Sequence, residues 1–312
     1  MITIALDTGN KQIKTDNDIF TAGITMSENI GIVSQENFYR KDGKYYALTT
    51  KRQPYMRDKT TSDRYFNLVM LGIAKELFRM ESIGEIINEK QIFDIHLLLG
   101  LPPAHMKDMQ LKRRFQNYFK MSEPARIFYM GKTYLIQVKK VNVYSQCFAA
   151  LTTIYPRIKD KPRVIGIDMG GFTADYIVME RGKVDVDTTD SLESGIIILY
   201  QKIKKACAAK DYLVEESDID NVLSGNSSGL DNVVIKIVKN ETIKFVDDFL
   251  NSFREFQIDL KNYHVVFIGG AALMLRPFIE NSTIIKSHEF IEDINANAKG
   301  YKMLYQIQNM QK

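Results

Sequence analysis

The sequence has few of the residues that cross-link a chain or hold a transition metal. Its two cysteines, Cys147 and Cys207, have no ligand-type spacing. This excludes a disulfide scaffold and is typical of a protein kept in a reducing cytoplasm. The four histidines form no zinc-type pattern either. A transition-metal enzyme is therefore not expected.

Long apolar runs are also missing, and none approaches the length of a membrane span. The N-terminal residues MITIALD carry no basic leader and reach a carboxylate at Asp7, which is unlike a signal peptide. We therefore expect a cytoplasmic protein with no membrane partner.

The excess of positive charge is small, a net +4 over 312 residues, so the balance alone does not indicate nucleic-acid binding. Two local basic clusters favour solvated helix faces, with a contact surface for a polymer neighbour or a nucleic-acid complex as the alternative. No direct sequence-specific DNA binding is expected. The first cluster consists of Lys107, Lys112, Arg113, Arg114 and Lys120, and the second of Lys202, Lys204 and Lys205.

The length of 312 residues predicts about two domains of roughly 150 residues each. A linker rich in proline and charge, residues 155–162, is the best boundary. We predict domain I over residues 1–155, with residues 18–60 as a small β-rich part. Domain II covers residues 156–294, with residues 190–250 as its small part. A last helix, at about residues 295–312, returns to domain I.

In the first half of the chain, apolar and β-branched segments predict strands at residues 2–6 and 92–99. The second strand should stop at Gly100. Hairpins are predicted at Asp42-Gly43 and around Gly131. A helix capped by Ser62 is predicted from the spacing of its apolar residues, and a basic helix over residues 104–120.

In the second half, strands are predicted at residues 164–167, 176–178, 184–186 and 263–268, with a turn at Gly182. Helices are predicted over residues 196–207 and 243–253. A third helix is predicted after the strand at residues 263–268 and should end at Pro277. The final helix is predicted over residues 295–308. Strands that alternate with helices are typical of an α/β fold.

One design occurs twice, about half the chain apart. A short apolar strand runs into Asp7-Thr8-Gly9 near the N-terminus, and a second runs into Asp168-Met169-Gly170-Gly171. A third strand ends in Gly269-Gly270. Each turn alone is as readily an ordinary strand end as a binding loop. Their order and repetition favour a binding site.

Glycine turns of this kind suit a nucleoside triphosphate, because backbone N–H groups can approach its phosphates closely. The two aspartates can hold hydrated magnesium, which keeps several of its waters. Lys14, seven residues after Asp7, should lie on the returning strand within reach of the phosphates. Its alternative interpretation is a surface lysine.

Two other nucleotide signatures are absent. Gly131-Lys132-Thr133 resembles the end of a P-loop, but the first glycine of that motif would fall on Arg126. No G-x-G-x-x-G sequence occurs, so a Rossmann dinucleotide site has no support.

The succession of these motifs resembles the actin, Hsp70 and sugar kinase superfamily, and most closely the bacterial actin-like ATPases of the ParM type. The resemblance implies an α/β, actin-like (RNase H-like) two-domain fold with a nucleotide cleft between the domains. It implies ATP as the nucleotide, with GTP as the alternative, and Mg²⁺. The motifs are Asp7-Thr8-Gly9-Asn10 with Lys14, Gln146, the run from Asp168 to Asp175, the run from Ile268 to Ala272, and a similar ending from Asn295 to Tyr301.

The same resemblance implies roles for individual residues. Asp7 and Asp168 would hold Mg²⁺, largely through water. Gln146 would orient the attacking water, with Asp168 as the second catalytic residue; because an amide takes no proton, slow hydrolysis is expected. Gln146 could equally be a plain helix N-terminal residue. The nucleotide-binding residues would be Thr8, Gly9, Asn10, Lys14, Gly170, Gly171, Phe172, Thr173, Gly269, Gly270 and Ala271.

Two of these positions depart from the family pattern. Phe172 stands where a small hydroxyl residue is common, which would remove one phosphate contact. Ala271 replaces a frequent third glycine, and its methyl group would tighten the nucleoside pocket.

The function implied is a filament protein that polymerises with itself on ATP, hydrolyses it, and segregates plasmid DNA through a DNA-bound adaptor protein. The alternative is a small-molecule kinase of the same superfamily. Such a kinase needs a base for the acceptor hydroxyl, and the sequence shows no carboxylate beside Gln146. A chaperone-like switch would carry a separate peptide-binding tail, for which little chain follows Gln308.

Overall fold

A computed structural model describes residues 1–31, 33–49, 53–54, 56–87, 91–227 and 229–310. The chain divides into two compact units, Met1–Thr153 with Asn295–Lys312, and Ile154–Ile294. The predicted boundary after residue 155 lies close to the first junction. Residues 50–52 and 55 of the predicted β-rich part, and residues 311–312 of the predicted last segment, lie outside the described residues.

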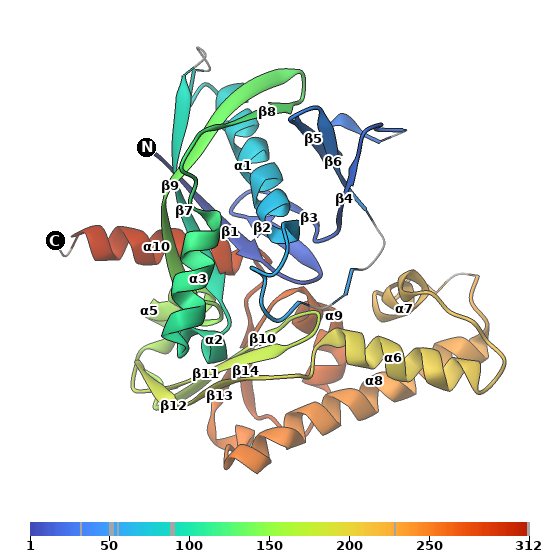
Figure 1. The fold of residues 1–312 in the computed structure, drawn as a ribbon. Coiled ribbons are helices and arrows are strands. Elements are labelled where there is room, and N and C mark those ends of the chain that lie inside the picture. The colour runs from blue at the N-terminus through green and yellow to red at the C-terminus, as the bar shows by residue number, and fades with distance from the viewer. Residues whose placement is uncertain (32, 50–52, 55, 88–90, 228, 311–312) are drawn as a thin grey trace. The chain divides into compact units, whose positions relative to one another are not determined.

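Within the described residues, the first unit contains one sheet in the strand order β3-β2-β1-β7-β9-β8-β5-β6-β4 (Figure 1). The predicted β-rich part thus belongs to the same sheet as β1. The strands are β1 (Ile2–Thr8), β2 (Gln12–Thr15), β3 (Ile19–Thr21), β4 (Ile24–Ser27), β5 (Phe38–Lys41), β6 (Lys44–Leu48), β7 (Ile92–Leu101), β8 (Ala125–Tyr129) and β9 (Lys132–Ser145).

Parallel pairing gathers three strand ends of this unit at one edge. β1 pairs parallel with β7, and β7 pairs parallel with β9. The hairpin strand β2 runs back along β1, with Lys14 opposite Asp7. The carboxyl ends of β1, β7 and β9, far apart in sequence, are therefore neighbours.

Helices cover both faces of the central strands. Side chains alternate between the two faces of a strand. Ile4 and Leu6 belong to the core that contains α1, whereas Ala5 between them packs with residues of α4 and α10. The helices of this unit are α1 (Arg64–Ser82), α2 (Pro103–Met106), α3 (Met109–Phe119), α4 (Phe148–Thr152) and α10 (Ala296–Met310), with the 3-10 turn η1 (Gln35–Asn37).

The second unit repeats the topology of the central strands. Its described sheet has the order β12-β11-β10-β13-β14, with β10 antiparallel to β11 and parallel to β13. This matches β3-β2-β1-β7-β9 strand for strand. The strands are β10 (Arg163–Met169), β11 (Ala174–Glu180), β12 (Lys183–Leu192), β13 (His264–Ile268) and β14 (Ser287–Phe290).

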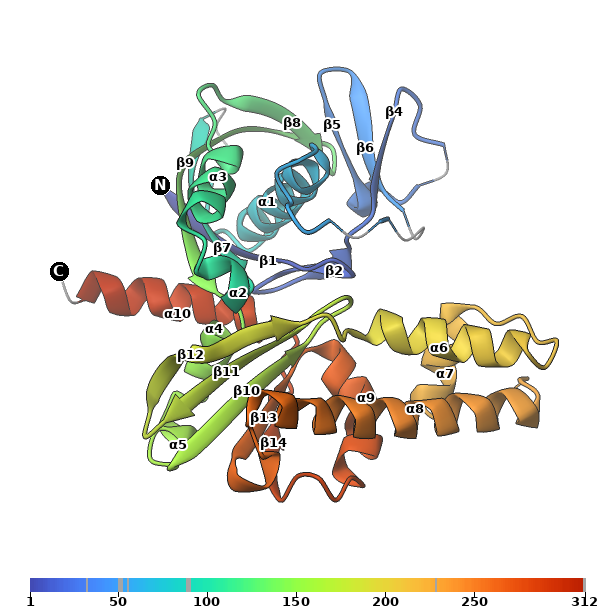
Figure 2. The same cartoon turned by 60° about the horizontal axis from the view of Figure 1, so that its bottom comes forward.

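Most helices of the second unit pack their apolar residues onto one core with this sheet. α6 and α8 lie side by side in Figure 2. The helices of this unit are α5 (Tyr155–Ile158), α6 (Ile196–Ala208), α7 (Glu216–Leu223), α8 (Asn232–Ser252) and α9 (Gly270–Glu280), with the 3-10 turns η2 (Phe253–Phe256) and η3 (Leu260–Asn262). No helix of the described residues is both long and apolar enough to cross a membrane.

The predicted α/β class is confirmed, and so are the hairpins at Asp42-Gly43 and Gly131. Several boundaries in the first unit were wrong. The cap of α1 is Asp63 rather than Ser62. β7 continues through Gly100 to Leu101, because it is paired with β9 up to its last residue. The basic helix is broken before α3, whose first turn is capped by Asp108.

Boundaries in the second unit also needed correction. Pro277 lies inside α9 and does not halt it. α8 begins at Asn232, eleven residues before the predicted start, behind an Asp231 cap. No helix was predicted where α7 lies. Residues 155–158, predicted as part of a linker, form the short helix α5.

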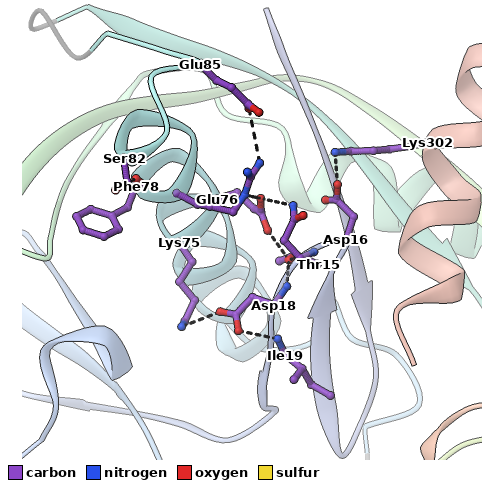
Figure 3. Close-up of polar contacts among 12 residues, drawn as sticks. Thr15, Asp16, Asp18, Ile19, Lys75, Glu76, Phe78, Ser82, Glu85 and Lys302 are labelled. Carbon is purple, nitrogen blue, oxygen red and sulfur yellow. Dashed lines mark hydrogen bonds and ion pairs between the residues drawn. The ribbon is translucent and has the colours of Figure 1, made fainter. Parts of the chain in front are cut away.

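A polar cluster attaches the turn after β2 to α1 and α10 (Figure 3). Glu76 of α1, only 3% exposed, accepts hydrogen bonds from the Thr15 hydroxyl and, at 2.9 Å, from Asn17 Nδ2. Arg79 Nε lies 3.0 Å from Glu76 Oε2, and the Lys302 ammonium of α10 forms an ion pair with Asp16. These contacts satisfy the buried carboxylate of Glu76 and fix the strand that carries Lys14.

Gly300 sets the approach of α10 to α4. A Cβ at Gly300 would lie 1.9 Å from the Ala149 carbonyl oxygen and 2.3 Å from its carbon. Because these atoms are backbone, α10 itself would have to move. We expect Gly300→Ala to lower the free energy of unfolding by about 1–3 kcal/mol in urea titrations, as overpacking does. Met303→Ala, at an exposed position of α10, is the control, and equal effects of the two would contradict this packing.

Candidate functional site

Asp7 is a buried carboxylate at the end of β1, only 5% exposed. Gln146, the residue after β9, donates from Nε2 to Asp7 Oδ1 at 2.6 Å. Two residues of α10 add longer hydrogen bonds, Asn297 Nδ2 to Oδ2 and the Tyr301 hydroxyl to Oδ1, both at 3.5 Å. The predicted catalytic residue and the predicted metal-binding residue of this unit are thus in direct contact.

The backbone after Gln146 holds its side chain in this position. Gln146 N–H donates to the Leu101 carbonyl of β7 at 2.9 Å, and Phe148 N–H donates to the Gln146 carbonyl at 2.7 Å. The intervening Cys147 has φ 62° and ψ −54°, the values of the rare γ-turn with positive φ. Such strain, of order 1–3 kcal/mol, persists only where the surroundings impose it, and often at functional sites. The turn therefore holds the Gln146 backbone in place, and its catalytic role stays a prediction.

No carboxylate was expected beside Gln146, and this was wrong, because Asp7 lies there. The two residues are far apart in sequence and meet because β1 and β9 both pair parallel with β7.

Two further residues of this contact, Asn297 and Tyr301, were not predicted as site residues. Asn297 also accepts the Cys147 N–H on its Oδ1 at 3.0 Å, which supports the γ-turn. The two lie four residues apart, on one face of α10. That spacing, in a segment already noted for its resemblance, was the available signal.

Gly100 leaves the space that Tyr301 occupies. A Cβ at Gly100 would lie 1.9 Å from the Tyr301 hydroxyl oxygen and 2.9 Å from Gln146 Cγ. This glycine had been interpreted as a strand stop. Its role in the structure is instead to admit a ring beside Asp7.

The first glycine turn, Thr8-Gly9-Asn10, is held by Lys59, which precedes α1, and by Tyr65 in the first turn of α1. The Lys59 ammonium donates to the Thr8 carbonyl, and the Tyr65 hydroxyl donates to Asn10 Oδ1 at 2.7 Å. A Cβ at Gly9 would lie 2.6 Å from the Gln12 carbonyl oxygen, so only glycine allows this hairpin to close. Lys14 lies opposite Asp7 in β2, on the returning strand where it was predicted.

The second glycine turn is held by the N-terminus of α6. Gly195, Ile196 and Ile197 donate their N–H groups to the Phe172, Gly170 and Gly171 carbonyls, at 2.9, 3.2 and 3.0 Å. The first N–H groups of a helix lack partners within it, and here the loop carbonyls supply them. A Cβ at Gly195 would lie 2.3 Å from the Gly171 carbonyl oxygen, so this docking requires glycine.

This docking fixes the direction of the loop's own N–H groups. The described peptide bonds include no cis bond, and in a trans peptide the C=O of one residue and the N–H of the next point in opposite directions. Since three carbonyls face α6, the N–H groups of Gly171, Phe172 and Thr173 point away from it. Successive N–H groups of this kind form an anion-binding concavity. A backbone donor at residue 172 does not depend on the side chain, and the loss of a phosphate contact expected from Phe172 stays a prediction.

Asp168 belongs to β10, and its carboxylate lies beside the start of α9. A Cβ at Gly269, whose φ is +91°, would lie 2.7 Å from Asp168 Oδ1. The carboxylate therefore packs against the glycine that caps α9, where the helix dipole favours negative charge. Asp175, 6% exposed, is opposite Asp168 in β11. The spacing of seven residues repeats that of Asp7 and Lys14, and could have marked Asp175 as a site residue.

The last glycine turn has one open and one buried side. A Cβ at Gly270 would meet nothing within 4 Å. Ala271 is 9% exposed, and its methyl group packs in the hydrophobic core of the unit. The tighter nucleoside pocket expected from Ala271 stays a prediction, as does the nucleotide cleft between the domains.

The structure therefore groups the predicted site residues unit by unit. Asp7, Gln146, Lys14 and the first turn lie together in the first unit, and Asp168 lies with the other two turns in the second. Within the described residues, no group of three or more His, Cys, Asp or Glu side chains could hold a metal ion. A magnesium ion that keeps most of its waters does not need such a group.

Comparisons with known proteins identify the fold. No protein-family model matches the sequence, and no curated protein matches it. Solved structures do match. Ta0583, an archaeal actin homolog, has a TM-score of 0.74 at 16% identity, over 98% of this chain and 100% of that one. The protein of a 15-stranded ParM filament from Clostridium botulinum has 0.73 at 19%, over 98% and 99%. The apo ParM protein of pSK41 has 0.67 at 14%, over 99% and 98%.

The chain thus has the two-domain actin-like fold, as the sequence predicted. The resemblance to ParM-type proteins is confirmed at the level of the fold, over nearly the whole length of each chain.

Asn297 should be the residue that holds the γ-turn against α10. We expect Asn297→Ala to leave the buried Cys147 N–H and one side of Asp7 without these partners, and to lower the free energy of unfolding by about 1–3 kcal/mol. Urea titrations monitored by circular dichroism measure it. Gln306→Ala, at an exposed position of α10, is the control and should change stability little. A loss no larger than that of the control would contradict the assigned contact.

Proposed function

We propose that this chain is an actin-like ATPase that binds and hydrolyses ATP with Mg²⁺ and polymerises into dynamic filaments. The observation that carries the proposal is the repeated strand end, an aspartate followed by a glycine turn, in both units of an actin-like fold. One ADP complex and two filaments occur among the matching structures, those of Ta0583, of a ParM protein and of Alp12.

ATP binding follows from the donors of the two turns. We propose that the N–H groups of Gly171, Phe172 and Thr173, with those of the first turn and the Lys14 ammonium, contact the phosphates. Gly269 and Gly270 approach the adenosine. GTP is the alternative nucleotide, since no contact of the described residues distinguishes adenine from guanine.

Magnesium fits the carboxylates available. Asp7 and Asp168 would hold it, largely through water, because the oxygens of Asp7 already accept hydrogen bonds from Gln146, Asn297 and Tyr301. When bound, the ion neutralises the charge of the phosphates.

Gln146 is the proposed catalytic residue of the first unit. Its Nε2 is engaged by Asp7, which fixes the amide and leaves Oε1 to accept from a water. An amide positions a water but accepts no proton from it, so hydrolysis should be slow. Slow hydrolysis gives a filament time to grow before its subunits change state.

Assembly is proposed to be head to tail between copies of this chain, as an open polymer. The cellular task proposed is plasmid DNA segregation in the cytoplasm, through a DNA-bound adaptor protein. A small-molecule kinase remains the second candidate, because Asp7 beside Gln146 could serve as the base that sequence reasoning did not find.

The first test is assembly. Pure protein mixed with ATP and Mg²⁺ should scatter light and pellet on centrifugation, and electron micrographs should show filaments. Protein with ATP and excess EDTA is the control and should remain in the supernatant. Absence of assembly across a range of protein and salt concentrations would reject the filament. Phosphate transfer to an added sugar or carboxylate, in place of release, would support the kinase.

The second test separates catalysis from binding. Gln146→Ala should slow phosphate release about 100-fold, the low end for a positioned catalytic group, while assembly on ATP is kept. Asp168→Ala should instead weaken Mg-ATP binding and assembly together. Gln110→Ala, at an exposed position of α3, should match the wild type in both assays. Unchanged hydrolysis in Gln146→Ala would show that its assigned role is wrong.

A further inference from the structure

Lys59 is a buried lysine at the first glycine turn that no sequence motif singled out. It lies between β6 and α1 and is only 7% exposed. Its ammonium donates to the Thr8 carbonyl and lies 3.4 Å from Thr8 Oγ1. Burying an ammonium is costly unless its donors are used. The position therefore calls for an explanation beyond surface solvation.

The contact with Thr8 fixes the orientation of the next N–H group. The Thr8 carbonyl and the Gly9 N–H belong to one planar trans peptide and point in opposite directions. An ammonium on the carbonyl therefore directs the Gly9 N–H away from Lys59. It also polarises the peptide, which makes that N–H a stronger donor.

In the second turn, the loop carbonyls accept hydrogen bonds from the N-terminus of a helix instead of from a lysine. There the N-terminus of α6 holds three loop carbonyls and orients the N–H groups behind them. In the first unit the corresponding hairpin is closed by Ala22 N–H on the Lys11 carbonyl at 3.1 Å, but the chain then enters β4, a strand. Lys59 supplies the positive charge at the first turn that a helix N-terminus supplies at the second.

The surroundings of Lys59 hold its ammonium in place. Asp58 Oδ1 accepts from the Thr60 N–H at 3.0 Å and from the Thr60 hydroxyl at 2.7 Å, which fixes the turn around Lys59. Arg114 of α3 pairs with Asp58 Oδ2 at 2.6 Å. The ammonium also lies 5.1 Å from the centre of the Tyr65 ring, whose hydroxyl binds Asn10. Lys59 and Tyr65 thus bind the residues on either side of Gly9, Thr8 and Asn10.

The charges near this turn are consistent with that arrangement. Burial raises the pKa of Asp58, but hydrogen bonds from Thr60 and Arg114 outweigh it and hold the pKa below its usual range. Burial, with the nearby Lys59 and Arg57 cations, lowers the pKa of His105 in α2, against smaller opposing effects of Asp58 and Asp108. Near neutral pH, Asp58 is ionised beside the turn that carries Lys59.

We propose that Lys59 is a positioning residue for the phosphate chain of a bound nucleotide, acting through the Gly9 N–H rather than by touching the nucleotide. Its ammonium holds the peptide between Thr8 and Gly9 so that the N–H faces the phosphate. The inference rests on the proposed function, because it requires that the first turn bind phosphate.

One labelling scheme isolates this peptide. Thr8-Gly9 is the only Thr-Gly pair in the chain. Protein labelled with ¹³C-carbonyl threonine and ¹⁵N-glycine therefore gives a single signal in a carbonyl-to-amide correlation spectrum. Its carbonyl shift reports the contact with Lys59, and its amide shift reports the contact with phosphate. The ligand is Mg-ADP, which avoids hydrolysis and assembly on ATP.

Lys59→Gln keeps a hydrogen-bond donor but removes the charge. We expect it to bind Mg-ADP about 10-fold more weakly, because hydrogen bonds from charged donors are roughly twice as strong as neutral ones. The Thr8 carbonyl signal should move upfield. Lys59→Arg, which keeps the charge, should recover most of the affinity. Lys44→Gln, an exposed lysine of β6, is the matched control and should bind as the wild type does.

The outcomes separate this inference from the function it rests on. If wild-type protein binds no Mg-ADP, both fail. If it binds and Lys59→Gln binds equally well, only the role of Lys59 fails. Should Lys59→Gln not fold, the wild-type spectrum decides: a Thr8-Gly9 signal unmoved by saturating Mg-ADP overturns the inference, and a shifted amide supports it.

Discussion

A buried carboxylate must be given hydrogen-bond donors, and in this protein the burial of Asp7 organises the first unit around that requirement. The donors come from the end of β9, through Gln146, and from α10, through Asn297 and Tyr301. Gly100 leaves room for Tyr301, and Gly300 lets α10 approach closely. Residues from both ends of the chain thereby meet at one strand end.

The two units solve one problem of backbone chemistry in different ways. A glycine turn that binds an anion must point its N–H groups outward, so its carbonyls need partners on the other side. In the second unit, α6 provides three N–H donors for those carbonyls. In the first, a side chain, Lys59, takes the Thr8 carbonyl. A helix N-terminus and an ammonium are physically equivalent here, since each brings positive charge to a carbonyl oxygen.

Predictions from local pattern were reliable where the pattern was complete within a few residues. The strands that carry Asp7 and Asp168, and the hairpins at Asp42-Gly43 and Gly131, are of this kind. Element limits that depend on packing were not. Gly100 could stay in β7 because pairing with β9 continues past it, and Pro277 could stay in α9 because tertiary contacts offset its lost hydrogen bond.

The sequence by itself determined the repeated aspartate and glycine turns, the α/β class and the likeness to actin-like proteins, because each depends on short-range order along the chain. Only the tertiary structure decided that Gln146 lies against Asp7, that α10 completes their contacts, and that Lys59 holds the first turn. These pairs are 139, 290 and 51 residues apart for Gln146, Asn297 and Lys59. Contacts over such separations arise from parallel strand pairing and helix packing, which no local pattern records.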